Sequence, residues 1–234
     1  MLNRVVSVFA LSSAALVSTP RPALAQQTLN FSLGYFTVRG EEARPARDIL
    51  LIQHNDLEFD ISEFNSVTYG GEWLAAVANH VEIGAGVAFA HRTVPTVVRR
   101  RVVTGGGEIE RDIDLREMPV ALTVRYLPFG QLYGVQPYAG GGLAVVRWRY
   151  RESGDFVLTN RTIVTEEHVA TGSALGPLFV VGLRAAGDAV AFGFDARYQR
   201  ASGSFGPVFA RVQSPEIDLS GWTLQGTAGI RFGR

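Results

Sequence analysis

The sequence predicts an all-β fold, a transmembrane up-and-down antiparallel β-barrel of about eight strands with short periplasmic turns and long extracellular loops. Three observations predict it. Apolar residues alternate with small or polar residues in eight segments. These segments run for about 10 to 15 residues, which reaches the 9 to 11 that a tilted strand needs to cross a bilayer. The connections between them alternate strictly between long and short.

The first 25 residues predict a secretory signal peptide. A positive charge precedes an apolar run over residues 5–17, and Ala23-Leu24-Ala25 has the small-x-small form of a signal peptidase site. The apolar run is shorter than the roughly 20 residues that a membrane-spanning helix needs. We therefore expect residues 1–25 to be cleaved and residues 26–234 to form one outer-membrane β-barrel domain.

The eight segments differ in regularity. In the most regular one, Phe192 and Phe194 lie on one face and Gly193 and Asp195 on the other. In chain order the predicted strands cover residues 28–38, 67–77, 81–91, 117–126, 136–151, 171–185, 190–199 and 222–232.

The connections place both ends of the barrel domain on one side of the membrane. The long ones cover residues 39–63, 95–112, 152–170 and 202–220, and the short ones residues 79–80, 128–135 and 187–188. Short turns are typical of the periplasmic side of outer-membrane barrels, so we expect both ends there. The first long loop contains Leu57, Phe59 and Ile61, which predicts a folded cap or a strand extension.

A soluble lipocalin-like barrel would show the same period with the apolar face turned inward. The side-chain types favour the membrane barrel, because the bulky face has aromatic residues near both ends and aliphatic residues between them. Near the long-loop ends these aromatic belts contain Tyr35, Tyr69, Trp148, Tyr150, Tyr198 and Trp222, and near the short-turn ends Tyr126, Tyr138, Phe192 and Phe232.

The opposite face carries ten charged residues, for which we expect a network inside the lumen. They are Glu72, Glu82, Glu117, Asp195, Arg125, Arg147, Arg149, Arg184, Arg197 and Arg231. Isolated buried ions cost several kcal/mol, so these charges should pair with one another. The network should fill the lumen and leave little conductance.

The composition excludes several classes of protein and site. The chain has no cysteine, which excludes disulfides, thiolate zinc sites and lipid attachment through an N-terminal cysteine. A formal net charge of zero argues against nucleic acid as a partner. The four histidines, His54, His80, His91 and His168, show no metal-binding spacing. We expect no cofactor and no metal.

One short segment approaches a catalytic pattern. Some small barrels modify lipid A, and they need a nucleophile and a base within hydrogen-bond reach. His91-Arg92-Thr93 is the nearest approach, with Thr where such a deacylase motif would have Ser. The favoured interpretation is an interfacial histidine beside an arginine that pairs with lipid phosphate or with a loop acid.

The basic run Arg99-Arg100-Arg101 also has two interpretations. It could bind lipopolysaccharide phosphates. In the favoured one, the hairpin turns at Gly105-Gly106 and brings Arg99 and Arg101 opposite Asp112 and Glu110 as cross-strand pairs.

The signal peptide, the eight alternating strands and the ending Trp222-Thr-Leu-Gln-Gly-Thr-Ala-Gly-Ile-Arg-Phe232 resemble the small outer-membrane β-barrel superfamily that includes the OmpA transmembrane domain and OmpX. Members usually end on an aromatic residue that resembles the signal read by the barrel assembly machinery, whereas here Gly233-Arg234 follows Phe232. The resemblance implies location in the outer membrane, contact with outer-membrane lipids and lipopolysaccharide, and the barrel assembly machinery as a partner during biogenesis.

For function we expect a non-enzymatic integral outer-membrane protein that acts through membrane structure or through its extracellular loops. Two alternatives stay open: a small passive pore and an outer-membrane lipid A-modifying enzyme. Eight strands enclose a lumen that side chains fill, which argues against the pore. The sequence does not specify an extracellular partner.

Overall fold

The computed structural model describes residues 26–102, 108–131, 134–157, 163–205 and 215–233. The predicted signal peptide and the Gly105-Gly106-Gly107 tip lie outside these residues. Eight strands build the barrel: β1 (Gln27–Val38), β3 (Ser66–Ala78), β4 (Val81–Val102), β5 (Glu108–Tyr126), β6 (Val135–Val157), β7 (Ile163–Ala186), β8 (Val190–Gln199) and β11 (Gly221–Phe232).

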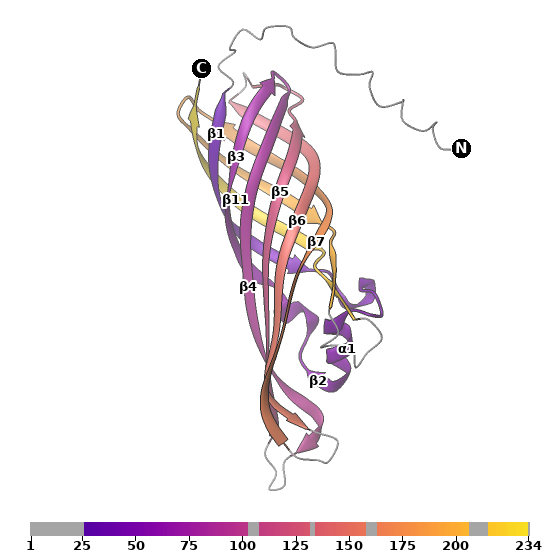
Figure 1. The fold of residues 1–234 in the computed structure, drawn as a ribbon. Coiled ribbons are helices and arrows are strands. Elements are labelled where there is room, and N and C mark those ends of the chain that lie inside the picture. Colours follow the sequence, from indigo (N-terminus) through magenta and orange to yellow (C-terminus); the bar gives the residue numbers. More distant parts are fainter. Residues whose placement is uncertain (1–25, 103–107, 132–133, 158–162, 206–214, 234) are drawn as a thin grey trace, which may run out of the picture.

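Every neighbouring pair of these strands is antiparallel, and the sheet closes on itself. The order around the barrel is β4-β3-β1-β11-β8-β7-β6-β5, and β5 pairs again with β4. The first and last strands are neighbours, with Gln27 opposite Phe232 and Val38 opposite Gly221. This is the predicted up-and-down layout, and the short turns lie at the same end as Gln27 and Phe232 (Figure 1).

Four consecutive strands continue far beyond the barrel, away from this end (Figure 1). β4, β5, β6 and β7 have 22, 19, 23 and 24 residues, whereas β1, β8 and β11 have 12, 10 and 12. The pairing of β6 with β7 runs to Val157 opposite Ile163. Much of the predicted loops 95–112 and 152–170 is therefore strand. We call this extension the ridge: residues 92–102 and 108–116 of β4 and β5, and residues 150–157 and 163–172 of β6 and β7.

The first long connection folds into a cap beside the ridge (Figure 1). It contains a short 3-10 helix Glu41–Ala43, α1 (Ile49–Asp56), β2 (Leu57–Glu58) and a second 3-10 helix Ile61–Phe64. β2 pairs with β4, and a short sheet of β9 (Ser202–Ser204) and β10 (Glu216–Asp218) joins the cap through a bridge between Asp48 and Glu216. The expectation of a folded first loop agrees with this arrangement.

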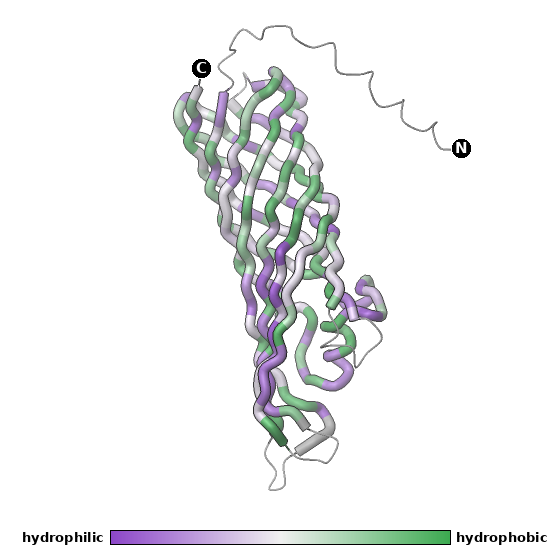
Figure 2. Tube along the Cα trace, viewed as in Figure 1, coloured by the Kyte–Doolittle hydropathy of each residue, from purple (hydrophilic) through white to green (hydrophobic). Residues whose placement is uncertain are grey.

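Hydrophobic residues recur along the strands of the spanning part (Figure 2), and many large ones are exposed on the outer face. Leu122 is 67% exposed, and its outward neighbours Val120 and Val124 are also exposed. A soluble protein would not leave such a continuous apolar surface open to water, so this face fits lipid. Among the described residues, no helix has the length and apolarity needed to cross a membrane.

A sealed lumen and its extracellular cap

An ion pair between Arg184 and Glu82, with two hydrogen bonds, closes the periplasmic half of the lumen. Arg184 on β7 contacts both carboxylate oxygens of Glu82 on β4, at 2.7 and 3.2 Å. Its remaining donors reach the Gln136 side chain oxygen, and Gln131 donates to Glu82 at 3.0 Å. A planar guanidinium suits this two-oxygen contact, so the pair spans the lumen with fixed geometry.

A second layer lies deeper in the barrel. Glu72 on β3 pairs with Arg125 on β5 and with Arg197 on β8, the latter at 2.7 Å. Arg197 also donates to Asp195 at 3.0 Å, and the Tyr138 hydroxyl donates to the same carboxylate at 3.0 Å. The Arg125 guanidinium lies 4.7 Å from the centre of the Tyr138 ring. Two acids and two arginines thus compensate one another in a desolvated interior.

Small residues on the facing strands make room for this layer. A Cβ atom at Gly84 would lie 2.5 Å from the Thr123 hydroxyl oxygen and 2.9 Å from a Glu72 carboxylate oxygen. Any side chain at this position would push Glu72 away from its partners. The small inward face seen in the sequence is therefore the space into which the charged side chains fold.

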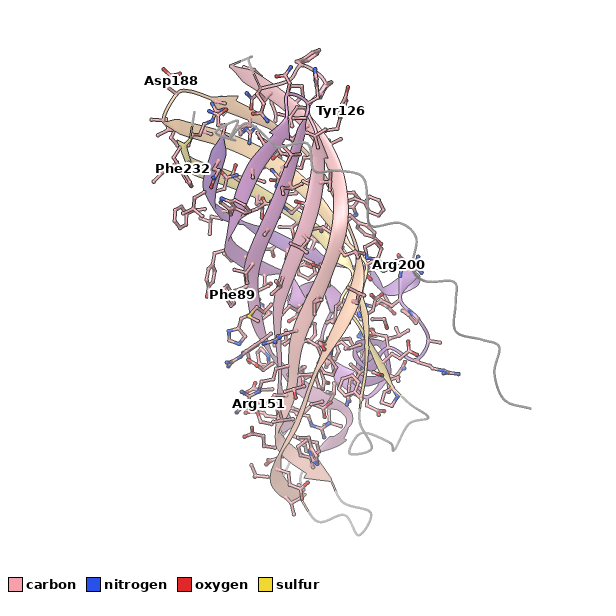
Figure 3. All side chains as sticks on the ribbon, turned by 45° about the horizontal axis from the view of Figure 1, so that its top comes forward. Phe89, Tyr126, Arg151, Asp188, Arg200 and Phe232 are labelled. Carbon is pink, nitrogen blue, oxygen red and sulfur yellow. The ribbon has the colours of Figure 1, made fainter. Side chains whose placement is uncertain are left out.

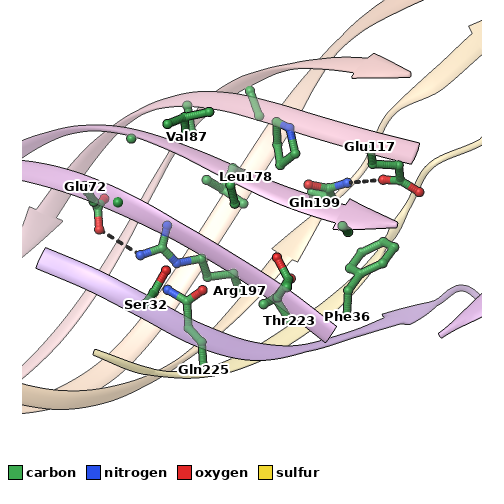
Figure 4. A pocket seen from close by; sticks show the side chains of 18 of the residues that line it. Ser32, Phe36, Glu72, Val87, Glu117, Leu178, Arg197, Gln199, Thr223 and Gln225 are labelled. Carbon is green, nitrogen blue, oxygen red and sulfur yellow. Dashed lines mark hydrogen bonds and ion pairs between the residues drawn. The ribbon is translucent and has the colours of Figure 1, made fainter. Parts of the chain in front are cut away.

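Above this layer lies a small cavity, and Glu117 stands at its far end (Figure 4). The cavity measures about 50 Å³ and reaches from Glu72 and Arg197 to Phe36 and Glu117. Such a volume holds several water molecules. Gln199 donates to Glu117 at 3.3 Å, and Glu117 forms no ion pair within the described part of the chain.

The cap is fastened over the lumen by a buried ion pair. Arg44 pairs with Asp48, and both side chains are fully buried. Arg44 also donates to the Asp218 carbonyl at 3.2 Å, and the Asp218 amide donates to Asp48 at 2.9 Å. Burial raises the pKa of Asp48, against the opposing charge of Arg44. We call Arg44, Asp48 and Asp218 the latch, because they join the cap to β10.

An apolar core fills the space between the latch and the barrel. It combines side chains of the cap, of the inner face of the ridge and of β10. Its buried members include Phe36, Leu50, Leu57, Phe59, Ile61, Phe64, Val94, Ile113, Leu115, Trp148, Tyr150, Ile217 and Leu219. The extracellular mouth is therefore closed by a hydrophobic core, and the periplasmic half by ion pairs.

The structure places most of the predicted lumen charges inside the barrel. Seven of them are buried or half-buried on the inner face: Glu72, Glu82, Glu117, Asp195, Arg125, Arg184 and Arg197. Arg231 lies at the periplasmic mouth, where it donates to the Gly187 carbonyl. Arg147 and Arg149 were wrongly assigned, because they lie on the outer face with Leu143 and Val145. β6 pairs with β7 without a register shift from Val135 to Val157. The side chains that point outward at Leu143 and Val145 are therefore followed by Arg147 and Arg149 on the same outer face, above the apolar zone.

Three residues of the predicted aromatic belts also face inward. Trp148 and Tyr150 are 4% and 0% exposed and belong to the apolar core of the mouth, and Tyr138 is 4% exposed and contacts Asp195. The polarity of the two faces inverts above the membrane, where the interior is apolar. The other belt residues lie on the outer face, namely Tyr35, Tyr69, Tyr126, Phe192, Tyr198, Trp222 and Phe232, and Figure 3 labels Tyr126 and Phe232 near the turn end.

Sequence reasoning missed the latch. The i,i+4 spacing of Arg44 and Asp48 was the available signal, but it is common in exposed helices, and nothing in the sequence ties either residue to Asp218. The contact spans more than 160 residues of chain and depends on the barrel bringing its ends together.

The geometry around His91 does not form a nucleophile–base pair. His91 and Thr93 both contact the Asp114 carboxylate, Thr93 at 2.9 Å, and no hydrogen bond joins His91 to Thr93 in the part of the chain described. A catalytic triad would place the histidine between acid and hydroxyl. In the same described part, no three His, Asp or Glu side chains gather to hold a metal ion.

The predicted pairs of the basic run are not formed at Arg99. Its side chain donates to the Leu57 carbonyl of the cap at 2.8 Å. Glu110 and Asp112 lie opposite Val97 and Pro95, since the pairing of β4 and β5 shifts register after Val97. The side chains of residues 100 and 101 lie outside the described part.

Comparison with known proteins identifies the fold only. No protein-family profile matches the chain, and no curated protein matches its sequence. Among solved structures, the outer membrane protein OprG of Pseudomonas aeruginosa aligns over 91% of this chain and 98% of its own, with 14% identity and a TM-score of 0.50. The Neisserial surface protein A aligns with 10% identity and a TM-score of 0.48, covering 88% and 97%. The attachment invasion locus protein Ail of Yersinia pestis, in complex with sucrose octasulfate, aligns with 10% identity and a TM-score of 0.45, covering 89% and 99%.

OprG is an outer membrane protein, and it shares this architecture over nearly its whole length. The closed ring of eight strands, the apolar outer face and the short turns at one end agree with that likeness. The chain therefore has the fold of a small outer-membrane β-barrel, with an outer face that fits lipid.

Proposed function

We propose that this protein is a non-enzymatic outer-membrane barrel that acts on the cell exterior through its ridge and cap. The observation that carries the proposal is the sealed lumen. Arg184 and Glu82 span it near one end, Glu72 and Arg197 span it further in, and the apolar core covers its mouth. A barrel closed in this way offers no continuous path for a solute, which disfavours the passive pore.

The ridge supports an interaction role because it is long, ordered and in part unpaired. β7 pairs with β8 only from Leu178 to Ala186, and Pro177 accepts a backbone hydrogen bond from Arg200. Within the described residues, the ridge segment 163–172 of β7 has β6 as its strand partner on one side. An extended strand edge can accept another strand through backbone hydrogen bonds. Cleavage of residues 1–25 and delivery by the barrel assembly machinery are part of the same proposal.

The test separates the ridge from the barrel. A shortened variant lacks the far ends of the two ridge hairpins. Asn-Gly turns join Thr96 to Arg111 and Ser153 to Glu167, which are residues that already face each other across their strand pairs. Cells displaying either form are captured on surfaces coated with serum proteins or with heparin, and their outer-membrane permeability to a dye is measured.

We expect capture to fall to background with the shortened variant, while dye exclusion and heat-modifiable migration stay as in the intact protein. Equal capture of both forms would contradict a role of the ridge. Loss of dye exclusion with the shortened variant would point to a role in membrane structure.

A further inference from the structure

A groove opens on the outer surface of the barrel, where β4, β5 and β6 leave the apolar zone. It measures about 430 Å³. On the membrane side its lining includes the stacked rings of Tyr69 and Phe89, whose centres are 5.7 Å apart. On the ridge side it is lined by four basic side chains, His91, Arg116, Arg147 and Arg149. We call this the outer groove; Figure 3 labels Phe89, one of the residues that line it.

The register brings two arginines, Arg116 and Arg149, directly opposite each other. Arg116 on β5 lies opposite His91 on β4 and opposite Arg149 on β6, and these side chains share the outward face. Side chains opposite each other on neighbouring strands are about 5 Å apart, and like charges there destabilise a sheet. The arrangement therefore calls for an anion between them.

Two acids lie near this place, and both are already engaged. Glu117 is among the residues that line the groove, but its carboxylate is buried in the lumen, where Gln199 donates to it. Asp114 accepts hydrogen bonds from Arg116 at 3.1 Å, from Thr93 and from His91. Arg147 and Arg149 form no ion pair within the described residues, and the Nε atom of Arg149 is buried without a partner. Excess positive charge thus remains in the outer groove.

The position of the groove relative to the membrane indicates that the anion is a lipid headgroup. Val120 and Val145 are the last exposed aliphatic residues before it on β5 and β6. Arg116 and Arg147 follow them by four and two residues, which is roughly 7 to 13 Å at the rise of a strand. This distance reaches the layer of lipid headgroups that borders the hydrocarbon core.

We propose that the outer groove binds the phosphate groups of lipid A in the outer leaflet of the membrane. Guanidinium groups contact phosphate oxygens with two parallel hydrogen bonds. Arg149 has a donor without a partner, and Arg147 forms no ion pair among the described residues. The rings of Tyr69 and Phe89 pack against the apolar part of the same lipid. The test of this site does not depend on the ridge partner, because Arg147 and Arg149 lie outside the ridge.

The test uses the refolded full-length barrel in phosphatidylcholine nanodiscs doped with one further lipid. The dopants are bis-phosphorylated lipid A, dephosphorylated lipid A and phosphatidylglycerol, and inorganic phosphate is added as a soluble competitor. Native mass spectrometry counts the dopant molecules retained by each barrel. The variants are R147Q/R149Q, the charge-retaining R147K/R149K and the control R47Q, which removes an exposed arginine of the cap.

We expect the wild type and R47Q to retain phosphorylated lipid A, R147Q/R149Q to bind it at least about tenfold more weakly, and the lysine variant to bind with intermediate strength. Equal retention by R147Q/R149Q, or equal retention of dephosphorylated lipid A, would overturn the proposal. Stronger retention of phosphatidylglycerol, or displacement by millimolar inorganic phosphate, would also overturn the assignment to lipid A. Should R147Q/R149Q fail to migrate as a folded barrel, the single variants R147Q and R149Q give the same comparison.

Discussion

Glu72 and Arg197 contact each other at 2.7 Å across the lumen, although β1 and β11 separate their strands in the sheet. The contact therefore crosses the barrel. It also joins residues 125 positions apart in the chain. Because Arg125 pairs with the same carboxylate, Glu72 holds two guanidinium groups in place.

Substitution of Glu72 by Gln should destabilise the barrel by about 3 to 5 kcal/mol, since it leaves a buried arginine without its acid. The measurement is urea unfolding in lipid vesicles, followed by tryptophan fluorescence. The control is E166Q on the exposed ridge, whose pair with His168 should contribute less than about 1 kcal/mol. An E72Q barrel as stable as E166Q would contradict the network.

Leu122 should lie near the middle of the bilayer. L122R should cost about 2 to 4 kcal/mol of unfolding free energy, because a cation then meets hydrocarbon. Y126R changes another exposed residue of β5, close to the turn end, and should cost only about 0 to 1 kcal/mol. Equal penalties in vesicle unfolding, or a larger one for Y126R, would show that the apolar zone is misplaced.

The latch should stabilise the cap but should not be needed for the barrel to stay folded. In R44Q the buried Asp48 loses its cation, so residues 49–61 should exchange their amide hydrogens much faster. Heat-modifiable migration should persist, because the lumen pairs are intact. R47Q, an exposed arginine three residues along, is the matched control and should leave exchange unchanged. Unchanged protection in R44Q would refute the latch.

Acid should weaken the contacts of Asp114 on the outer face of the ridge. Burial acts to raise the pKa of this carboxyl, but hydrogen bonds from His91 and Thr93 and the charge of Arg116 outweigh burial and lower it below 3.8. Its stabilising contribution is therefore present above pH of about 4 and is lost as pH falls through the folded pKa.

The measurement compares the urea midpoints of wild type and D114N. The gap between the two midpoints should narrow as the pH falls below the ordinary pKa of an aspartate. A gap that widens in acid would mean that the pKa of Asp114 is raised, contrary to the geometry.

The period of two was enough to predict the barrel, because lipid on one face and a narrow lumen on the other impose opposite side chains at Leu122 and Thr123. The same rule failed for Trp148 and Tyr150. Above the membrane the outer face meets headgroups and water while the interior is filled by the cap, so the polarity of the two faces is reversed there.

The ends of the long strands could not be predicted for a related reason. Residues 163–172 carry Glu166, Glu167 and His168, which look like a solvated loop, yet backbone pairing with β6 keeps them extended. The inner charges were found because Glu72 and Arg197 interrupt otherwise small or apolar faces. Their partners depend on the closure of the barrel, which no local pattern encodes.

Single-channel recording in planar bilayers tests the central claim most directly, because the claim is that the lumen is sealed and that function lies outside it. The refolded wild-type barrel should insert without conductance steps above the leak, at neutral pH and at either polarity. Stable, large conductance steps from the wild type would contradict the sealed lumen and would restore the pore as the leading function.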